Sequence, residues 1–133
     1  MLALAAVALA LTRPPAAYLD TGATHVPLTI SSWCLAARCG APIARARRVA
    51  TVRRGATVRI HLAYAPTEVA LAVGGVRVAP KVHGTDLTWR ATRGGGLSLT
   101  PVAVSGFVTY VGRLALRNRN GRRCRPSRCS AAG

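Results

Sequence analysis

The chain has 133 residues, of which 19 are Lys or Arg and only three are Asp or Glu, so its formal net charge is +16. This length allows one ordinary domain and excludes a multidomain enzyme. The longest apolar run is too short to span a bilayer, which excludes a polytopic membrane protein. Half of the residues are apolar, so a packed core is expected. The composition therefore indicates a small, very basic, exported domain.

The N-terminal segment has the composition of a targeting sequence. Leu2 to Leu11 is an unbroken run of Leu, Ala and Val, and its length is that of the apolar core of a signal peptide. We predict that residues 1–23 form a signal peptide or signal anchor, with small residues near Ala17 and Ala23 as candidate cleavage positions. The protein would then be secreted or held in the cell envelope. The alternative is an Ala-rich first helix packed on the domain.

From residue 25 onward, apolar and polar residues alternate, as in strands with one buried face. The pattern predicts a strand over 26–30 and then a hairpin whose strands are 47–52 and 57–62. In the second strand of this hairpin, three apolar residues face the core and three polar residues face solvent. These are Val58, Ile60 and Leu62, and Thr57, Arg59 and His61.

Glycines divide the second half of the chain into further strands. Gly74-Gly75 permits the positive φ values of a tight turn, which predicts a hairpin between residues 69–73 and 76–78. Strands over 87–91 and 97–100 follow, separated by a run of three glycines. The last predicted strand covers 106–116, with Gly112 as a candidate bulge.

About seven short strands without a helical period predict an all-β fold. We expect a small antiparallel β-sandwich over residues 24–117, followed by a basic, cysteine-containing tail over 118–133. The stretch Gly-Ala-Thr-Val-Arg-Ile-His-Leu, a proline-containing turn and then Val-Ala-Leu-Ala-Val-Gly-Gly resemble the middle of an immunoglobulin-like module of bacterial secreted proteins. The resemblance implies adhesion, substrate presentation or scaffolding, and it carries over no functional residues.

The four cysteines form two pairs with equal spacing. Cys34 and Cys39 enclose four residues, and so do Cys124 and Cys129. Residues five apart meet across a tight turn, so we favour two local disulfides. Pairing between the two ends of the domain is the alternative, and it would close much longer loops. A four-cysteine zinc site is disfavoured because the two pairs lie far apart in the sequence and lack the usual spacing, so we predict no metal.

The chain offers few groups for catalysis. Asp20 falls within the predicted signal segment, so a mechanism with paired carboxylates would need Glu68 with Asp86. His61 and His83 are expected at the surface, and no nucleophile motif surrounds any serine near them. We therefore predict a protein that is not an enzyme, with no catalytic residue and no cofactor.

Positive charge concentrates in the predicted first hairpin and in the tail. Each segment holds six arginines and no acid, and together they contain 12 of the 19 basic residues. Such blocks attract polyanions in a salt-sensitive manner. We expect them to contact an anionic polymer or an anionic membrane surface. The candidate anion-binding residues are Arg45, Arg47, Arg48, Arg53, Arg54, Arg59, Arg117, Arg119, Arg122, Arg123, Arg125 and Arg128.

Two other functions are compatible with the same sequence. One is a structural module that binds another protein through a strand edge or the loop at Trp33, with the charge incidental. The other is an intracellular nucleic-acid-binding or zinc-binding protein. Stacking aromatic residues are nearly absent from both arginine segments, which argues against a single-strand nucleic-acid platform and against sequence-specific binding. We therefore favour a non-catalytic, extracytoplasmic β-sandwich with an anionic partner.

Overall fold

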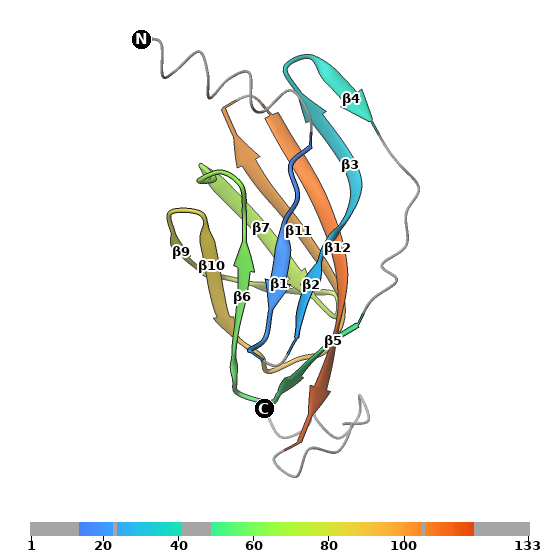
Figure 1. The fold of residues 1–133 in the computed structure, drawn as a ribbon, viewed down its shortest axis with the longest axis vertical. Coiled ribbons are helices and arrows are strands. Elements are labelled where there is room, and N and C mark those ends of the chain that lie inside the picture. The colour runs from blue at the N-terminus through green and yellow to red at the C-terminus, as the bar shows by residue number, and fades with distance from the viewer. Residues whose placement is uncertain (1–13, 23, 41–48, 105, 119–133) are drawn as a thin grey trace.

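The computed structural model describes residues 14–22, 24–40, 49–104 and 106–118, and these residues form twelve β-strands and no helix (Figure 1). The fold is therefore all-β, as predicted. Five of the strands have only three residues, which is too short for a recognisable alternation. The strands are β1 (Tyr18–Asp20), β2 (His25–Pro27), β3 (Thr29–Leu35), β4 (Arg38–Gly40), β5 (Val49–Arg53), β6 (Thr57–His61), β7 (Glu68–Val73), β8 (Val76–Val78), β9 (Lys81–His83), β10 (Asp86–Arg90), β11 (Gly95–Ala103) and β12 (Gly106–Arg117).

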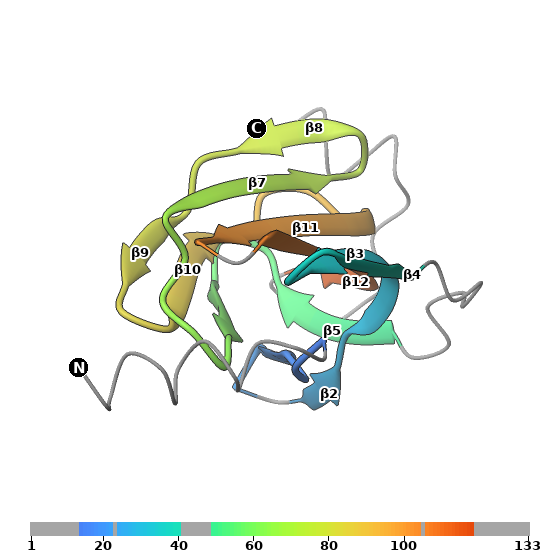
Figure 2. The same cartoon turned by 90° about the horizontal axis from the view of Figure 1, so that it is seen from above.

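Two sheets lie face to face around one core (Figure 2). The five-stranded sheet has the order β2-β1-β6-β10-β9. The seven-stranded sheet has the order β4-β3-β12-β11-β7-β8, and β5 also pairs with β12. All of these pairings are antiparallel except that of β5 with β12, which is parallel.

The core is built from the alternating apolar residues of both sheets. On β6 and β10, the inward side chains are fully buried or nearly so, while their neighbours face solvent. This confirms the alternation predicted over 57–62, and the strands over 87–91 and 106–116 also bury the expected residues. Each buried Leu, Ile or Val contributes about 1.5–3 kcal/mol relative to an exposed one. The most buried of these residues are Leu19, Leu35, Val58, Ile60, Leu71, Val73, Leu87, Leu97, Leu99 and Val108.

Two tyrosines carry hydroxyl groups into this core, and both hydroxyls are satisfied. Tyr64 donates to the Pro101 carbonyl (2.7 Å), and Tyr110 donates to the Pro15 carbonyl (2.6 Å). Burial raises the pKa of Tyr64 to about 12, and it raises the pKa of Tyr110 as well. The bond to Pro15 also fixes the chain that leads into β1.

Two of the tight hairpins reach positive φ at both turn residues, one with glycines and the other with alanines. Gly74 and Gly75 both have positive φ (58° and 79°) and join β7 to β8, as predicted. Ala36 and Ala37 adopt positive φ (49° and 63°) between β3 and β4, a conformation that costs alanine free energy.

A disulfide closes the second of these hairpins. Cys34 and Cys39 lie opposite each other in the register of β3 with β4, and their sulfur atoms are bonded. The prediction of a local pair is confirmed here. Cys124 and Cys129 lie outside the described residues.

The predicted hairpin between residues 47–52 and 57–62 is wrong. Both segments contain strands, but β5 belongs to the seven-stranded sheet and β6 to the five-stranded sheet. The turn between them crosses from one sheet to the other, and the Arg54 N–H donates to the Arg117 carbonyl (2.9 Å). β5 pairs with the second half of β12 because β12 extends beyond β3.

Two further local predictions need correction. The run over 26–30 is not one strand, since β2 and β3 separate at Leu28 and lie in different sheets. The register shift in β12 occurs between Thr109 and Tyr110, not at Gly112. A Cβ at Gly112 would lie 2.7 Å from Leu28 Cδ2, so this glycine provides space for the Leu28 side chain instead of forming a bulge.

The sheet begins upstream of residue 24, where the sequence placed the start of the domain. β1 lies within the predicted N-terminal segment 1–23, yet Leu19 is fully buried and pairs with Ile60 on β6. Cleavage after Ala23 would therefore remove a strand of the five-stranded sheet. In the described ranges, no helix is long and apolar enough to cross a membrane.

Candidate functional site

The outer face of the five-stranded sheet brings histidines, carboxylates and basic residues together in two neighbouring rows. One row across this sheet places Tyr18, His61, Asp86 and His83 side by side. The adjacent row on the same face holds His25, Asp20, Arg59, Thr88 and Lys81. All three histidines and two of the three carboxylates of the chain therefore lie on this face.

His61 lies between two carboxylates in what we call the His61 cluster, formed by Tyr18, Asp20, His25, His61 and Asp86. Its Nδ1 is 2.7 Å from Asp86 Oδ1, and its Nε2 is 3.7 Å from Asp20 Oδ2. The His25 ring stacks on Tyr18, with 5.1 Å between the ring centroids. The two acids of this face are therefore neighbours of a histidine.

Asp20 is the most constrained acid of this cluster. The Gly22 N–H donates to Asp20 Oδ1 at 2.8 Å, and this bond holds the pKa of Asp20 below its usual range. Partial burial opposes the lowering of this pKa, while His61 and His25 add to it. The carboxylate is therefore the favoured form of Asp20 in the fold.

The cluster does not assemble the catalytic arrangement that the sequence left open. Glu68 lies on β7 in the other sheet, so it does not pair with Asp86. The groups around His61 are carboxylates, another imidazole and a phenol, and no serine or cysteine of the described ranges hydrogen-bonds to it. Among the described residues, no group of three or more His, Cys, Asp or Glu side chains is placed to hold a metal ion.

The parallel pairing of β5 with β12 brings together arginines from the two predicted segments. Arg53 and Arg117 are register partners, and Arg54 follows directly. Both strands end at the same end of the molecule, the lower end in Figure 1. The turn that contains Arg54 also bonds to the chain at the end of β10, because the Gly55 N–H donates to the Ala91 carbonyl and the Ala91 N–H donates to the Ala56 carbonyl. Arg90 therefore reaches the same end from the five-stranded sheet.

Lys81 and Arg90 lie around a surface depression that the sequence did not predict. The depression has a volume of about 400 Å³, and its polar lining includes the Thr57 and Thr88 side chains. Thr88 pairs with Lys81, and Arg90 pairs with Thr57, so the four residues lie on neighbouring strands. Val78, Ala79 and Trp89 complete the lining, and the side that holds the two cations and two threonines is suited to a compact anionic group. The strand pattern placed Arg90 on the outer face, but only the strand register shows which residues surround it.

We call Arg53, Arg54, Lys81, Arg90 and Arg117 the basic end of the molecule. Arg53, Arg54, Lys81 and Arg90 form no salt bridge in the described part of the chain, where both salt bridges involve His61. Arg59 lies between the two regions, because its register partners are Asp20 and Thr88. The remaining predicted anion-binding residues lie outside the described residues. They are Arg45, Arg47, Arg48, Arg119, Arg122, Arg123, Arg125 and Arg128.

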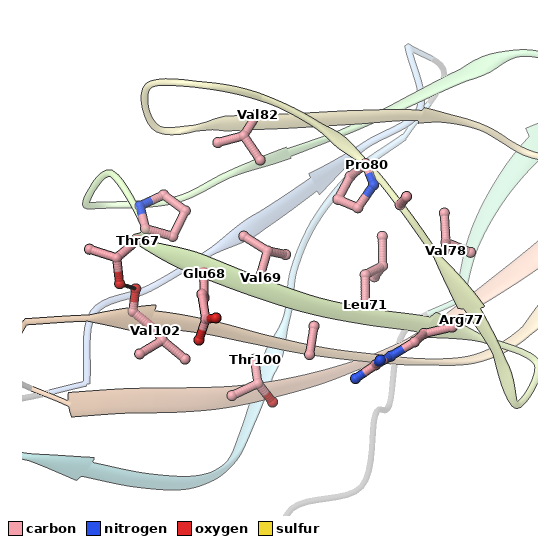
Figure 3. A pocket seen from close by; sticks show the side chains of 13 residues that line it. Thr67, Glu68, Val69, Leu71, Arg77, Val78, Pro80, Val82, Thr100 and Val102 are labelled. Carbon is pink, nitrogen blue, oxygen red and sulfur yellow. Dashed lines mark hydrogen bonds between the residues drawn. The ribbon is translucent and has the colours of Figure 1, made fainter.

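A second, larger hollow of about 690 Å³ lies beside β7 and shares Val78 and Ala79 with the first (Figure 3). Val69 and Leu71 point toward Pro80 and Val82 across it, whereas Glu68 points the other way. Its lining includes Glu68 and Arg77 beside the apolar residues, whereas both charged residues of the depression at Lys81 and Arg90 are cations. No family model, curated protein or solved structure matches this chain. Functional conclusions therefore follow from the geometry of these surfaces.

Proposed function

We propose that this protein is a non-catalytic, secreted or cell-envelope module with an immunoglobulin-like sandwich fold, which binds anionic polymers through its basic end. The observation that carries the proposal is the convergence of Lys81, Arg90 and the arginines of β5 and β12 at one end without salt-bridging carboxylates for Arg53, Arg54, Lys81 and Arg90. The expected partners are polymers that bear phosphate, sulfate or carboxylate groups.

The strand order supports the immunoglobulin-like part of this proposal. The order β1-β6-β10-β9 corresponds to strands A-B-E-D of such a sandwich, and β12-β11-β7-β8 corresponds to G-F-C-C′. The strands β2, β3 and β4 add to this arrangement at the sheet edges. The Cys34–Cys39 disulfide is weakly consistent with an oxidising, extracytoplasmic compartment.

The charge balance supports a polyanion over a neutral partner. Exposed cations without local counter-charges attract polyanions and release their counterions on binding, which makes such binding sensitive to salt. In this chain, both carboxylates of the five-stranded sheet lie beside His61, and neither forms a salt bridge with Lys81 or Arg90. The basic end therefore keeps its positive potential for a partner.

The proposal is tested by removing charge from this end and comparing an equal loss of charge elsewhere. The double variant Lys81→Gln, Arg90→Gln is compared with Arg38→Gln, Arg113→Gln in the full chain, since Arg38 and Arg113 are exposed on the seven-stranded sheet. Affinity for dextran sulfate and for polyphosphate is measured over a range of salt, with neutral dextran as the blank.

We expect the Lys81, Arg90 variant to bind about tenfold more weakly and to show a shallower salt dependence, by up to about two in the slope of log K against log salt. The Arg38, Arg113 variant should lose much less affinity. Equal losses in both variants would mean that affinity depends only on net charge. If the wild-type protein bound neither dextran sulfate nor polyphosphate, the proposed function would be refuted.

A further inference from the structure

β7 is paired along its full length on one side and along only half of it on the other. On one side, every residue from Glu68 to Val73 has a register partner on β11. On the other side, β8 pairs only with the three residues from Leu71 to Val73. The first half of β7 is therefore an open strand edge.

The direction of the backbone groups identifies the residue that is left open. Successive residues of an antiparallel strand direct their N–H and C=O groups to opposite sides. Gly74 N–H donates to Gly96 on the β11 side (2.9 Å), so alternate residues before it, from Ala72, bond to β11. Val73, Leu71 and Val69 then direct their backbone groups to the β8 side.

Proline explains why the ladder stops before Val69. The register of β7 with β8 continues to a position where Val69 lies opposite Pro80. Proline has no N–H to donate, and the chain leaves there to form β9 in the other sheet. In the described part of the chain, no backbone hydrogen bond joins Val69 to this connection. The Val69 N–H and C=O therefore remain available at the edge.

The open edge borders the 690 Å³ hollow beside β7. The Val69 and Leu71 side chains form one wall, and those of Pro80 and Val82 form the opposite one (Figure 3). Val82 is 45% exposed, a high fraction for a valine on a strand. Glu68 lies at the rim and forms no salt bridge in the described chain.

We propose that this edge binds an extended segment of a partner protein by strand addition, with the backbone of that segment hydrogen-bonded to Val69. The unpaired N–H and C=O groups require a partner with a peptide backbone, which distinguishes this site from a simple apolar hollow. The residue opposite Val69 points between the sheets toward Val82 and is a branched apolar residue. The next residue faces outward beside Glu68 and is basic.

A proline at residue 69 tests this site because it removes only the edge donor. The Val69 N–H does not take part in the ladder with β11, so Val69→Pro keeps the native pairing while it abolishes donation to a partner. Val69→Thr is the matched control, since it preserves the N–H and the shape of the side chain. The probe is the peptide acetyl-Thr-Val-Lys-Val-Thr-amide, added at millimolar concentration to ¹⁵N-labelled full-length protein and followed by amide chemical shifts.

We expect the shifts to concentrate at residues 67–70 and 82 in wild type and in Val69→Thr, and affinity to fall about tenfold in Val69→Pro. A peptide N-methylated at both valines should not bind wild type, which tests the backbone bonds even if Val69→Pro fails to fold. Absence of shifts in wild type, or equal binding of the N-methylated peptide, would overturn the inference. Binding of dextran sulfate does not depend on Val69, so this result is independent of the proposed function.

Discussion

The His61 cluster and the Lys81 and Arg90 side of the basic end lie on the same five-stranded sheet but differ in how their charges are paired. In the cluster, Asp20 and Asp86 flank His61, and the backbone N–H of Gly22 lowers the pKa of Asp20. At the basic end, Lys81 and Arg90 have two hydroxyl groups and no acid beside them. Two of the three acids of the chain lie beside histidines, and within the described residues Arg53, Arg54, Lys81 and Arg90 form no salt bridge. This difference in charge pairing is the basis on which we propose an external anionic partner for the basic end.

The largest expected effect comes from the strand that supports the His61 cluster. Leu19 is fully buried next to Asp20, whereas Tyr18 on the other face of β1 is 39% exposed. Leu19→Ala should destabilise the fold by about 2–5 kcal/mol because it leaves a cavity. Tyr18→Ala should cost no more than about 1 kcal/mol. Urea unfolding of the two variants measures this contrast, and similar losses would show that β1 does not pack as described.

A new carboxylate at the basic end should abolish the difference between the two regions. Thr88 lies between Arg59 and Lys81 in the register, so Thr88→Glu creates opposite-charge pairs on both sides. Affinity for dextran sulfate should fall several-fold, while the free energy of unfolding rises by up to about 1 kcal/mol. Ser98→Glu on the seven-stranded sheet is the control, since it adds the same charge to an exposed strand position. An equal loss of affinity in this control would argue against a localised site.

The smallest expected effect concerns Asp20 and pH. Its pKa is lower in the fold than in the unfolded chain, so its contribution to stability is complete above the unfolded value and is lost as pH falls through the folded value. Asp20→Asn keeps an oxygen for the Gly22 N–H but does not titrate. Wild type should therefore melt at a higher temperature than the variant near neutral pH and approach it in acid. A difference in Tm that does not change with pH would contradict this account of Asp20.

Much of the fold follows from local patterns in the sequence. The outward positions of Thr57, Arg59 and His61 were predictable because period-two alternation assigns each residue to one face. The Gly74-Gly75 turn was predictable because glycine tolerates positive φ. The Cys34–Cys39 pair followed from a spacing that fits a tight turn. These features depend on residues close together in the chain.

The main errors, the hairpin over 47–62 and the single strand over 26–30, concern which strands become neighbours. The alternation of residues 49–53 and 57–61 is compatible both with a hairpin and with strands in two different sheets. The second arrangement forms because β12 extends beyond β3 and offers its second half to β5. The open edge at Val69 could not be predicted from the sequence either, because it depends on the register of β8, which places Pro80 opposite Val69. Lys81 was missed for the same reason, since it lies seven residues from Thr88 in the chain but beside it in the sheet.

The sequence by itself determined the all-β class, the buried face of the longer strands and the excess of positive charge, and it favoured the local Cys34–Cys39 pairing. Alternation, turn chemistry and composition are local properties, so they can be recognised without knowing the partners of each strand. Only the tertiary structure decided that Arg53 meets Arg117, that His61 lies between two acids, and that Val69 has an open edge. These features depend on strand register and sheet order, which are set by how the two sheets bury their apolar faces together.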